Sequence, residues 1–314
     1  MIKKIIEIAT EGARLSVMHR QLVIERPARP VAAVPCEDIG VLIVDHRAVT
    51  YTHSVFTTLI EFGAAVVLCG ADHHPAGLLL PMAGNTVQTE RYRSQVEASL
   101  PLRKQLWRAL VSAKLRQQGD VLEEAIGSDA GLKAMASRVR SGDPTNLEAQ
   151  GAQRYWPRLF GPAFRRDRAG PPPNNLLNYG YAILRAAMAR ALVAAGLMPT
   201  LGIHHHNRYN AFCLADDAME PYRPFVDRKV RALCTSGTTP DSLDRETKQT
   251  LLGLFNDTIE IAGRRTPLLL ALHATAASFA QSFLEDRAEI ALPRGLPRLA
   301  DDEPEKEPAD AGAA

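Results

Sequence analysis

The sequence contains no hydrophobic run of the ~18 residues that a membrane-spanning helix needs, so we expect no such helix. The start, MIKKIIEIATEGARL, has only a short apolar part with acidic residues close by, and we therefore expect no signal peptide. Cysteine is also scarce: the four cysteines are scattered and never form a Cys-x-x-Cys pair. This usage is typical of reduced thiols, and it favours a cytoplasmic protein that does not contact a membrane.

Several nucleotide-binding and hydrolase motifs are absent as well. The chain has no P-loop, no GxGxxG that opens a helix, no GxSxG and no internal repeat. These absences argue against a P-loop NTPase, a dinucleotide-dependent enzyme, an α/β-hydrolase and a repeat protein. The composition is that of an ordinary globular protein, with 46% hydrophobic and 23% charged residues. A chain of 314 residues is long enough for two domains.

Acidic residues are unevenly distributed along the chain. Residues 299–314 hold one basic residue and six acidic ones, which are Asp301, Asp302, Glu303, Glu305, Glu307 and Asp310. Outside that tail 36 of the 37 basic residues and 29 of the 35 acidic residues remain, so the net charge of +2 becomes +7. A basic body favours an anionic partner, most commonly DNA or RNA, although many basic proteins bind neither.

Hydrophobic patterning divides the chain into a β-rich part and a helical part. The first part alternates short β-branched runs with turn residues, and the second places apolar residues at helical spacing. Helices are predicted there up to residues 244–261 and beyond, with a connector and a short helix over residues 118–131. We therefore predict an α+β protein, with a β domain over residues 1–86, a helical domain over residues 87–293 and a disordered tail over residues 294–314.

One stretch, residues 202–227, combines imidazoles with carboxylates. It reads GIHHHNRYNAFCLADDAMEPYRPFVD, and its three histidines follow a loop rich in helix breakers. Asp217 and Glu220 are three residues apart, so on a helix they share one face. Histidine and carboxylates are the usual ligands of a catalytic divalent metal. The alternative is a loop that bonds its own backbone, followed by acids that the helix dipole favours at a helix start.

A further acidic residue lies on a predicted helix elsewhere in the chain. Asp143 as N-cap and Pro144 as the first helical residue predict the start of this helix, and Pro157 should end or kink it. Glu148 shares a face with Gly151, whose bare backbone would let a ligand come close. The alternative is a solvent-exposed glutamate on a helix that packs tightly through Gly151, and the residues alone favour it.

Arginine and aromatic residues are interleaved around the end of this helix. Arginines among aromatics on an irregular segment suit phosphate contacts and base stacking, so we predict DNA binding here. A mobile loop without a role is the alternative. The candidate DNA-binding residues are Arg154, Arg158, Arg165, Arg166 and Arg168.

These groups suit chemistry on phosphodiester bonds. In-line attack at phosphorus gathers negative charge on the non-bridging and leaving oxygens, and a divalent metal held by carboxylates neutralises it. Oxygen ligands favour Mg²⁺ or Mn²⁺, and a histidine among them shifts the balance towards Mn²⁺. Such a site needs ligands from separate elements and a basic approach, and Glu148, the histidine loop and the two acids Asp217 and Glu220 would supply the ligands.

Five ordered motifs resemble those of a known family. They are VPCEDIGVLIVD (residues 34–45), CGADHHPAGLLLPMAGNTVQTERYRSQ (69–95), NLEAQGAQRYWPRLFG (146–161), NNLLNYGYAILRA (174–186) and the stretch 202–227 quoted above. With these motifs the chain resembles the CRISPR-associated integrase of spacer acquisition, the family often called Cas one, in its type II variety. The resemblance covers nearly everything up to about Leu292.

The resemblance implies a fold, an assembly and an activity. It implies a small N-terminal β domain through which the chain forms a homodimer, and a larger all-α C-terminal domain. Two such dimers would bracket a dimer of a small partner, often called Cas two, in a heterohexamer. The family captures short duplex DNA, the prespacer, and joins its 3′-hydroxyls to the CRISPR repeat by transesterification. The type II variety implies work alongside the RNA-guided nuclease of the same locus.

The resemblance also implies, residue by residue, a site for Mg²⁺ or Mn²⁺. The family's glutamate falls on Glu148, the histidine of its Gly-x-x-His motif on His205, and the acid before Pro-x-Arg-Pro on Glu220. Asp217 matches a second acidic position. The other two histidines of the loop are left for substrate contact or for no role. Two alternatives stay open: a DNA-binding scaffold with a vestigial site, and a metal-dependent repair nuclease that cleaves without joining.

Overall fold

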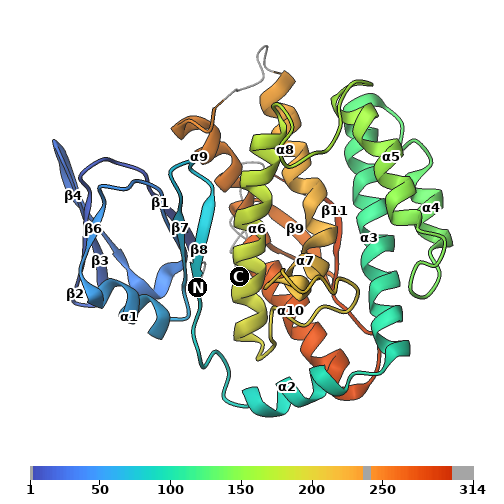
Figure 1. Ribbon diagram of the computed structural model, residues 1–314, viewed down its shortest axis with the longest axis horizontal. Coiled ribbons are helices and arrows are strands. Elements are labelled where there is room, and N and C mark those ends of the chain that lie inside the picture. The colour runs from blue at the N-terminus through green and yellow to red at the C-terminus, as the bar shows by residue number, and fades with distance from the viewer. Residues whose placement is uncertain (1–2, 236–241, 299–314) are drawn as a thin grey trace, which may run out of the picture.

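The computed structural model describes residues 3–235 and 242–298 and has two parts of different composition (Figure 1). A β-rich N-terminal part precedes a larger, mainly helical C-terminal part, as the hydrophobic pattern predicts. Each part has a buried hydrophobic cluster of its own. Among the described residues no helix is long and apolar enough to cross a membrane.

The N-terminal part consists of two four-stranded sheets and one helix, α1 (His53–Glu61). One sheet has the order β4-β3-β2-β6, from β2 (Arg14–Met18), β3 (Gln21–Arg26), β4 (Arg29–Pro35) and β6 (Thr50–Tyr51). The other has the order β1-β5-β7-β8, from β1 (Lys4–Ile8), β5 (Ile39–Val44), β7 (Ala65–Cys69) and β8 (Pro75–Leu79). Leu15, Leu42 and Leu59 join both sheets and α1 in one core.

The C-terminal part is built around two long helices, α3 (Leu100–Ile126) and α6 (Asn174–Ala194). The helices packed around them are α2 (Gln88–Glu97), α4 (Leu132–Arg138), α5 (Leu147–Phe160), α7 (Cys213–Met219), α8 (Arg223–Thr235), α9 (Arg245–Gly253) and α10 (Leu268–Glu285). The short 3-10 helices Glu220–Tyr222 and Leu254–Asn256 also belong to this part, whereas Cys36–Asp38 is a 3-10 helix of the N-terminal part. Packing is close: a Cβ at Gly180 of α6 would lie 2.4 Å from Val226 Cγ1 of α8, so no larger side chain fits.

The C-terminal part is not all-α, contrary to the prediction. It contains an antiparallel sheet of order β10-β9-β11, made of β9 (Thr258–Ile261), β10 (Arg264–Pro267) and β11 (Pro293–Arg298). The helix predicted over residues 244–261 is therefore wrong in its second half, because the β-branched residues there pair as a hairpin. Ala262 and Gly263 adopt the two successive positive φ angles, 49° and 72°, that a two-residue hairpin turn requires. Residues 294–298 of the predicted tail belong to β11, and residues 299–314 lie outside the described residues.

Helix α3 is longer than the sequence pattern indicates. A connector and a separate short helix are predicted over residues 118–131, but α3 continues without a break to Ile126 and ends at Gly127 in the left-handed conformation. Gly119 lets α4 pack closely here, since a Cβ at this position would lie 2.9 Å from Lys133 Cγ. With this length α3 contacts α4, α5, α8, β11 and the 3-10 helix Glu220–Tyr222.

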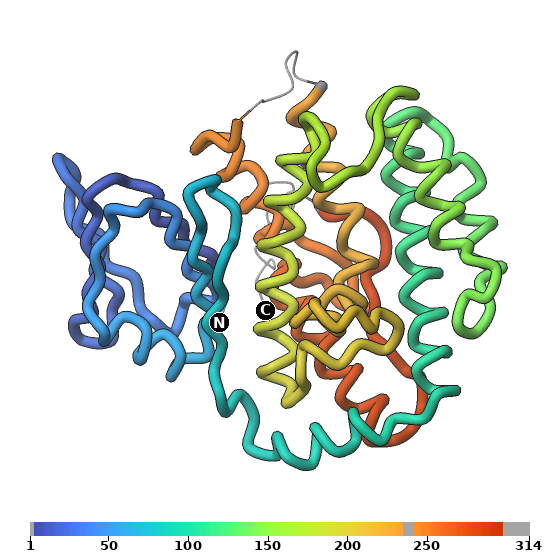
Figure 2. The backbone as a smooth tube through the Cα atoms, viewed as in Figure 1, coloured from blue at the N-terminus to red at the C-terminus, as the bar shows by residue number. Residues whose placement is uncertain are grey.

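The two parts of the chain meet where the sheet β1-β5-β7-β8 packs beside α6 (Figure 2). Val41 and Ile43 of β5 belong to the same buried cluster as the helices. Next to this apolar contact, Lys248 of α9 is buried between two acidic side chains of the N-terminal part. Its Nζ pairs with Asp45 and lies 3.8 Å from Glu7 Oε1. A buried ion pair therefore fixes how α9 sits on the N-terminal sheet.

Candidate active site

Two of the predicted ligands, Glu148 and Glu220, lie side by side although they come from different helices. Glu148 is in the first turn of α5, and Glu220 opens the 3-10 helix that follows α7. Between them lies the ammonium group of Lys114, from the middle of α3. Its Nζ pairs with Glu148 Oε1 and lies 2.6 Å from Glu220 Oε2. Three elements that are distant in sequence thus meet at one cationic atom.

The position of Glu148 depends on a capped helix start. α5 begins at Leu147 with Asn146 as N-cap, so the predicted start, with Asp143 as N-cap and Pro144 in the first turn, is wrong. Asp143 instead acts from outside the helix. Its carboxylate accepts hydrogen bonds from Leu147 N at 2.9 Å and Glu148 N at 3.0 Å, which satisfies backbone donors that the first turn leaves free. The backbone of Glu148 is thereby held in place.

The bare backbone at Gly151 does not face a ligand. A Cβ at this residue would lie 2.2 Å from Leu115 Cδ2, so Gly151 is the point where α5 packs tightly on α3. The tight-packing alternative is confirmed for Gly151. It also explains the site, because close approach of the two helices is what brings Lys114 to Glu148. Pro157 does not end the helix either, since α5 continues to Phe160.

The carboxylate of Glu220 is almost fully buried, with 5% of the residue exposed. Burial by itself would raise its pKa, but the positive charges of Arg223 and Lys114 outweigh burial and lower the pKa of Glu220 to about 2. Arg223 Nε lies 2.8 Å from Glu220 Oε1, on the side opposite Lys114. The pair of cations keeps this buried acid ionised.

The histidine loop is held by Asp217, whose carboxylate is fully buried. It accepts hydrogen bonds from Ile203 N at 2.8 Å and from His204 N at 2.9 Å. It also lies 2.5 Å from His205 Nδ1, and because an ionised carboxylate only accepts, Nδ1 carries the proton. This hydrogen bond raises the pKa of His205. Nε2 of His205 is then the nitrogen that is free to bind a ligand.

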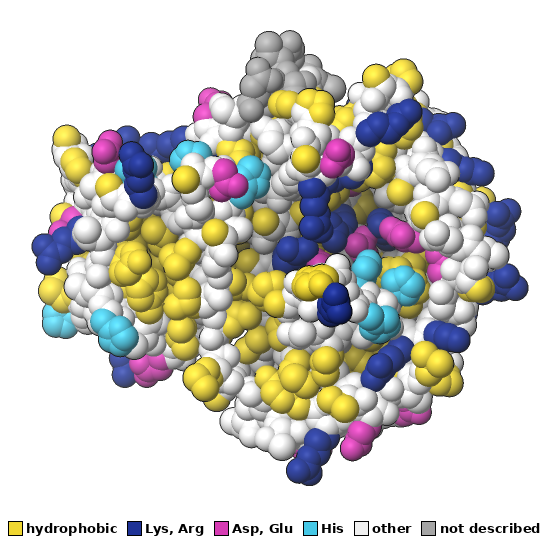
Figure 3. Space-filling model, viewed as in Figure 1, with side chains coloured by type: hydrophobic (Ala, Val, Ile, Leu, Met, Phe, Trp, Pro, Cys, Tyr) yellow, Lys and Arg dark blue, Asp and Glu magenta, His cyan; other side chains and the backbone are white. Residues whose placement is uncertain are grey.

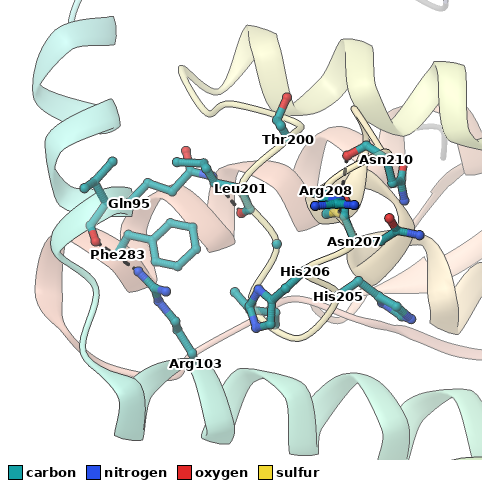
Figure 4. Close-up of a pocket in the computed structure, with 14 residues that line it drawn as sticks. Gln95, Arg103, Thr200, Leu201, His205, His206, Asn207, Arg208, Asn210 and Phe283 are labelled. Carbon is teal, nitrogen blue, oxygen red and sulfur yellow. Dashed lines mark hydrogen bonds between the residues drawn. The ribbon is translucent and has the colours of Figure 1, made fainter.

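The neighbouring rings fix the loop from the other side. Trp107 of α3, almost fully buried, stacks on His204 with ring centroids 4.0 Å apart and an angle of 1° between the planes. The His205 ring meets Trp107 edge-on at 5.7 Å. On its outer side the loop borders a cavity of about 380 Å³, into which His206 and Arg103 point (Figure 4). The loop is therefore ordered around His205, between Trp107 and this cavity.

The residues present fit a hard divalent cation in part. Glu148 and Glu220 direct carboxylate oxygens at one position, which is the chemistry that Mg²⁺ and Mn²⁺ prefer. Glu220 Oε2 is buried and accepts no well-directed hydrogen bond, although Lys114 Nζ is an ion-pair partner at 2.6 Å. His205 does not join the two glutamates: in residues 3–235 and 242–298, no three His, Cys, Asp or Glu side chains form a metal-binding group.

Comparison with known proteins identifies the family. The model of the family described as CRISPR associated protein Cas1 matches residues 6–255. The CRISPR-associated endonuclease Cas1 of Neisseria meningitidis serogroup C (strain 8013) is 37% identical over 290 residues, which cover 91% of this chain and 94% of that protein.

The chain belongs to the Cas1 family.

The family resemblance inferred from the five sequence motifs is therefore confirmed. A more distant relative, the CRISPR-associated endonuclease Cas1 2 of Pyrobaculum aerophilum, is 26% identical over 298 residues, 88% of this chain and 98% of that protein.

Solved structures of similar fold include Cas1 proteins and a casposase. A casposase bound to integration product has a TM-score of 0.75 at 18% identity and covers 98% of this chain and 96% of that one. A Cas1 protein from Thermotoga maritima has a TM-score of 0.69 at 16% identity, with 90% and 97% covered. A chain of a Cas6-RT-Cas1–Cas2 complex has a TM-score of 0.71 at 17% identity, with 91% and 35% covered. At these identities the likeness establishes the fold alone.

The five candidate arginines of this Cas1 family member occupy different environments. Arg166 and Arg168 line a cavity of about 310 Å³ whose wall includes Glu148 and Glu220. Arg158 instead donates to the carbonyl of Arg154, four residues before it on the exposed side of α5. Arg165 donates to two carbonyl oxygens of its own loop. Basic side chains gather beside acidic ones and histidines in a hollow of the helical part (Figure 3).

Several residues of this candidate site escape sequence reasoning. Lys114 lies in a basic and amphipathic helix, where a solvent-exposed position is the ordinary expectation. Trp107 follows a core leucine and gives no sign that it stacks on a histidine. Asp227 is buried against the hydroxyls of Tyr155 and Tyr181, with Tyr155 Oη 3.1 Å from Asp227 Oδ2. The only available signal is its position four residues after Arg223, at the end of the acidic stretch.

Proposed function

We propose that this chain is a divalent-metal-dependent DNA integrase of CRISPR adaptation. It would capture short duplex DNA and join the 3′-hydroxyls of that duplex to the CRISPR repeat by transesterification. The observation that carries the proposal is the convergence of Glu148 and Glu220 on one cation position, beside a cavity lined by Arg166 and Arg168. Membership of the Cas1 family supports it, as does the similarity to a casposase bound to integration product.

The proposed reaction assigns roles to residues of this chain. A bound Mg²⁺ or Mn²⁺ would supply charge neutralisation at the phosphate. Glu148 and Glu220 would hold it, with Nε2 of His205 as a third ligand once the loop approaches, since Asp217 keeps Nδ1 protonated. The arginines of the cavity would hold phosphates of the DNA. In the joining step the 3′-hydroxyl oxygen bonds to a repeat phosphorus, and the displaced oxygen of the repeat strand takes up a proton.

We propose the same partners and setting as the sequence resemblance implies. The chain would form a homodimer through its N-terminal part, and two dimers would flank a Cas2 dimer in the cytoplasm. The similarity to a chain of a Cas6-RT-Cas1–Cas2 complex supports the Cas2 partner. The relative from Neisseria meningitidis supports the type II assignment, and with it an RNA-guided nuclease as a further partner.

The test is a strand-transfer assay with a short duplex bearing 3′-hydroxyls, repeat DNA, Mg²⁺ or Mn²⁺ and the Cas2 partner. Glu148→Ala, His205→Ala and Glu220→Ala should each abolish joined product. Glu90→Ala and His53→Ala, at exposed positions on α2 and α1, are matched controls and should retain it. Full activity of Glu148→Ala would refute the site assignment.

A DNA-binding scaffold with a vestigial site is the second candidate, and one observation favours it: among the described residues, His205 stands apart from the two glutamates. A scaffold would bind duplex DNA with steep salt dependence but give no metal-dependent product. A repair nuclease would give cleaved strands and no joined ones. The products of the wild-type protein on the same gel therefore separate all three functions.

A further inference from the structure

Lys114 is a buried lysine that no part of the proposed reaction uses. It comes from the middle of α3, and only 7% of the residue is exposed. Its ammonium group pairs with both Glu148 and Glu220. Lysine is almost never buried unless it is paired, so the two carboxylates are what make this position tolerable. The reverse also holds, because the two carboxylates need a cation between them.

The ammonium group and a divalent ion would need the same position. Carboxylate oxygens coordinate Mg²⁺ at about 2.0–2.1 Å and Mn²⁺ at similar distances, which leaves no room for a third group between them. Arg223 does not compete in this way, because it bonds Glu220 Oε1 from the other side. Lys114 is thus the single cation in the described residues that occupies the point where the two ligands converge.

A cavity next to the two glutamates could receive the Lys114 ammonium group if an ion displaces it. The cavity of about 310 Å³ beside the two glutamates is lined by Lys114 itself, by Gln118, Trp156 and Asp227, and also by the cationic side chains of Arg166, Arg168 and Arg223. A lysine ammonium rides on a flexible four-carbon stem and is strongly hydrated. Such a side chain can change its rotamer while the α3 backbone stays in place, and solvent water and the Asp227 carboxyl of this cavity would offset the charge of the arginines.

We propose that Lys114 is an internal counter-cation, which holds the site together without metal and must leave its place between Glu148 and Glu220 before a divalent ion binds. This inference rests on the proposed function for its assignment of the two ligands. It makes Lys114 a positioning residue that competes with the metal. The metal affinity of the wild-type protein is accordingly lower than the same two carboxylates would give alone.

The test is a titration of the full-length protein with Mn²⁺, followed by the electron paramagnetic resonance signal of the free ion. Lys114→Met removes the ammonium group and keeps much of the apolar stem. Because a buried charge pair is broken when the wild type binds metal, Lys114→Met should bind Mn²⁺ about tenfold more tightly or better. Without metal its Tm should fall, and Mn²⁺ should raise the Tm more than in the wild type.

A matched control is available at the surface of the helical part. Lys133 of α4 also bridges two carboxylates, with Nζ 2.8 Å from Asp120 Oδ1 and 2.5 Å from Glu123 Oε2, but 40% of its side chain is exposed, against 9% for Lys114. Lys133→Met should leave the affinity for Mn²⁺ unchanged. A merely structural role for Lys114 would weaken metal binding when the residue is lost, so an unchanged or weaker affinity in Lys114→Met overturns the proposal.

The failure of this inference is distinguishable from the failure of the proposed site. If Glu220→Gln abolishes Mn²⁺ binding but Lys114→Met binds no more tightly, only the role of Lys114 is wrong. If wild type and Lys114→Met both bind no Mn²⁺, the metal site and the inference fall together. Should Lys114→Met not fold without metal, Lys114→Gln replaces it. Tighter binding by that variant supports the inference, and unchanged binding overturns it.

Discussion

Gly202 offers a sharp test of how the histidine loop is built. A Cβ at this residue would lie 2.4 Å from the carbonyl oxygen of His205, 2.9 Å from Cys213 Cβ and 3.0 Å from Asp217 Oδ2. Ordinary contact begins near 3.4 Å, so in Gly202→Ala the His205 carbonyl must retreat by about 1 Å. A displacement of this size at a catalytic site can lower the rate about 10²-fold. The overpacking itself should lower the free energy of unfolding by about 1–3 kcal/mol.

Two measurements on Gly202→Ala check this reasoning, namely strand transfer with the Cas2 partner and urea unfolding. Gly253→Ala is the matched control, because Gly253 has a helical φ of −55° and a Cβ at that position would meet nothing within 4 Å. That control should keep full activity and be as stable as the wild type or up to about 1 kcal/mol more stable. Wild-type activity and stability in Gly202→Ala would refute the claim that the loop has no room at this point.

Three further perturbations test charges elsewhere in the molecule. Burial raises the pKa of Asp227 to about 7, above its unfolded value. The stability that the protonated carboxyl contributes is therefore lost as pH rises from about 4 through 7. The Tm of Asp227→Asn relative to that of the wild type should accordingly be higher at about pH 8 than at about pH 5. Lys248→Met leaves two buried carboxylates without their cation and should lower the free energy of unfolding by about 3–5 kcal/mol in urea titrations. Arg166→Ala should weaken binding of duplex DNA and reduce its salt slope by about 1, whereas Arg158→Ala should change neither, as measured by fluorescence anisotropy.

A specific outcome would contradict each of these three predictions. A relative Tm for Asp227→Asn that is the same at both pH values would mean that the carboxyl titrates normally. A change below about 1 kcal/mol in Lys248→Met would place the pair among weak surface ion pairs. Equal salt slopes for the two arginine variants would show that the cavity beside Glu148 is not on the path of the DNA.

The sequence predicts the elements well wherever one local rule dominates. Regular apolar spacing gives α6 and α10, and short β-branched runs between turns give β5 and β7. Prediction fails where tertiary contacts decide. Helix α3 runs through Gly119 because α4 packs against it, and no local signal reveals that contact. The hairpin of β9 and β10 is missed for a related reason. Residues 258–261 also fit a helical apolar pattern, and pairing of β9 with β11, which lies far along the chain, favours the strand.

The same distinction between local patterns and tertiary contacts applies to the candidate site. Spacing alone places Asp217 and Glu220 near each other, and the family motif selects His205 among three histidines. Spacing does not reveal which group each carboxylate contacts. Asp217 accepts hydrogen bonds from the histidine loop, whereas Glu220 pairs with Lys114, which is distant in sequence. Lys114 is invisible in the sequence because its role depends on α3, α5 and the 3-10 helix Glu220–Tyr222 meeting at one point.

The contact between α3 and the last described strand joins distant parts of the chain. Gln117, three residues after Lys114, donates from Nε2 to the carbonyl of Pro293 in β11 at 2.9 Å, and both ends of this bond are buried. The bond therefore joins the middle of α3 to the three-stranded sheet β10-β9-β11. Helix α3, which carries Lys114, is therefore tied to a strand 176 residues further along the chain, and a variant that lacks β11 loses this buried hydrogen bond.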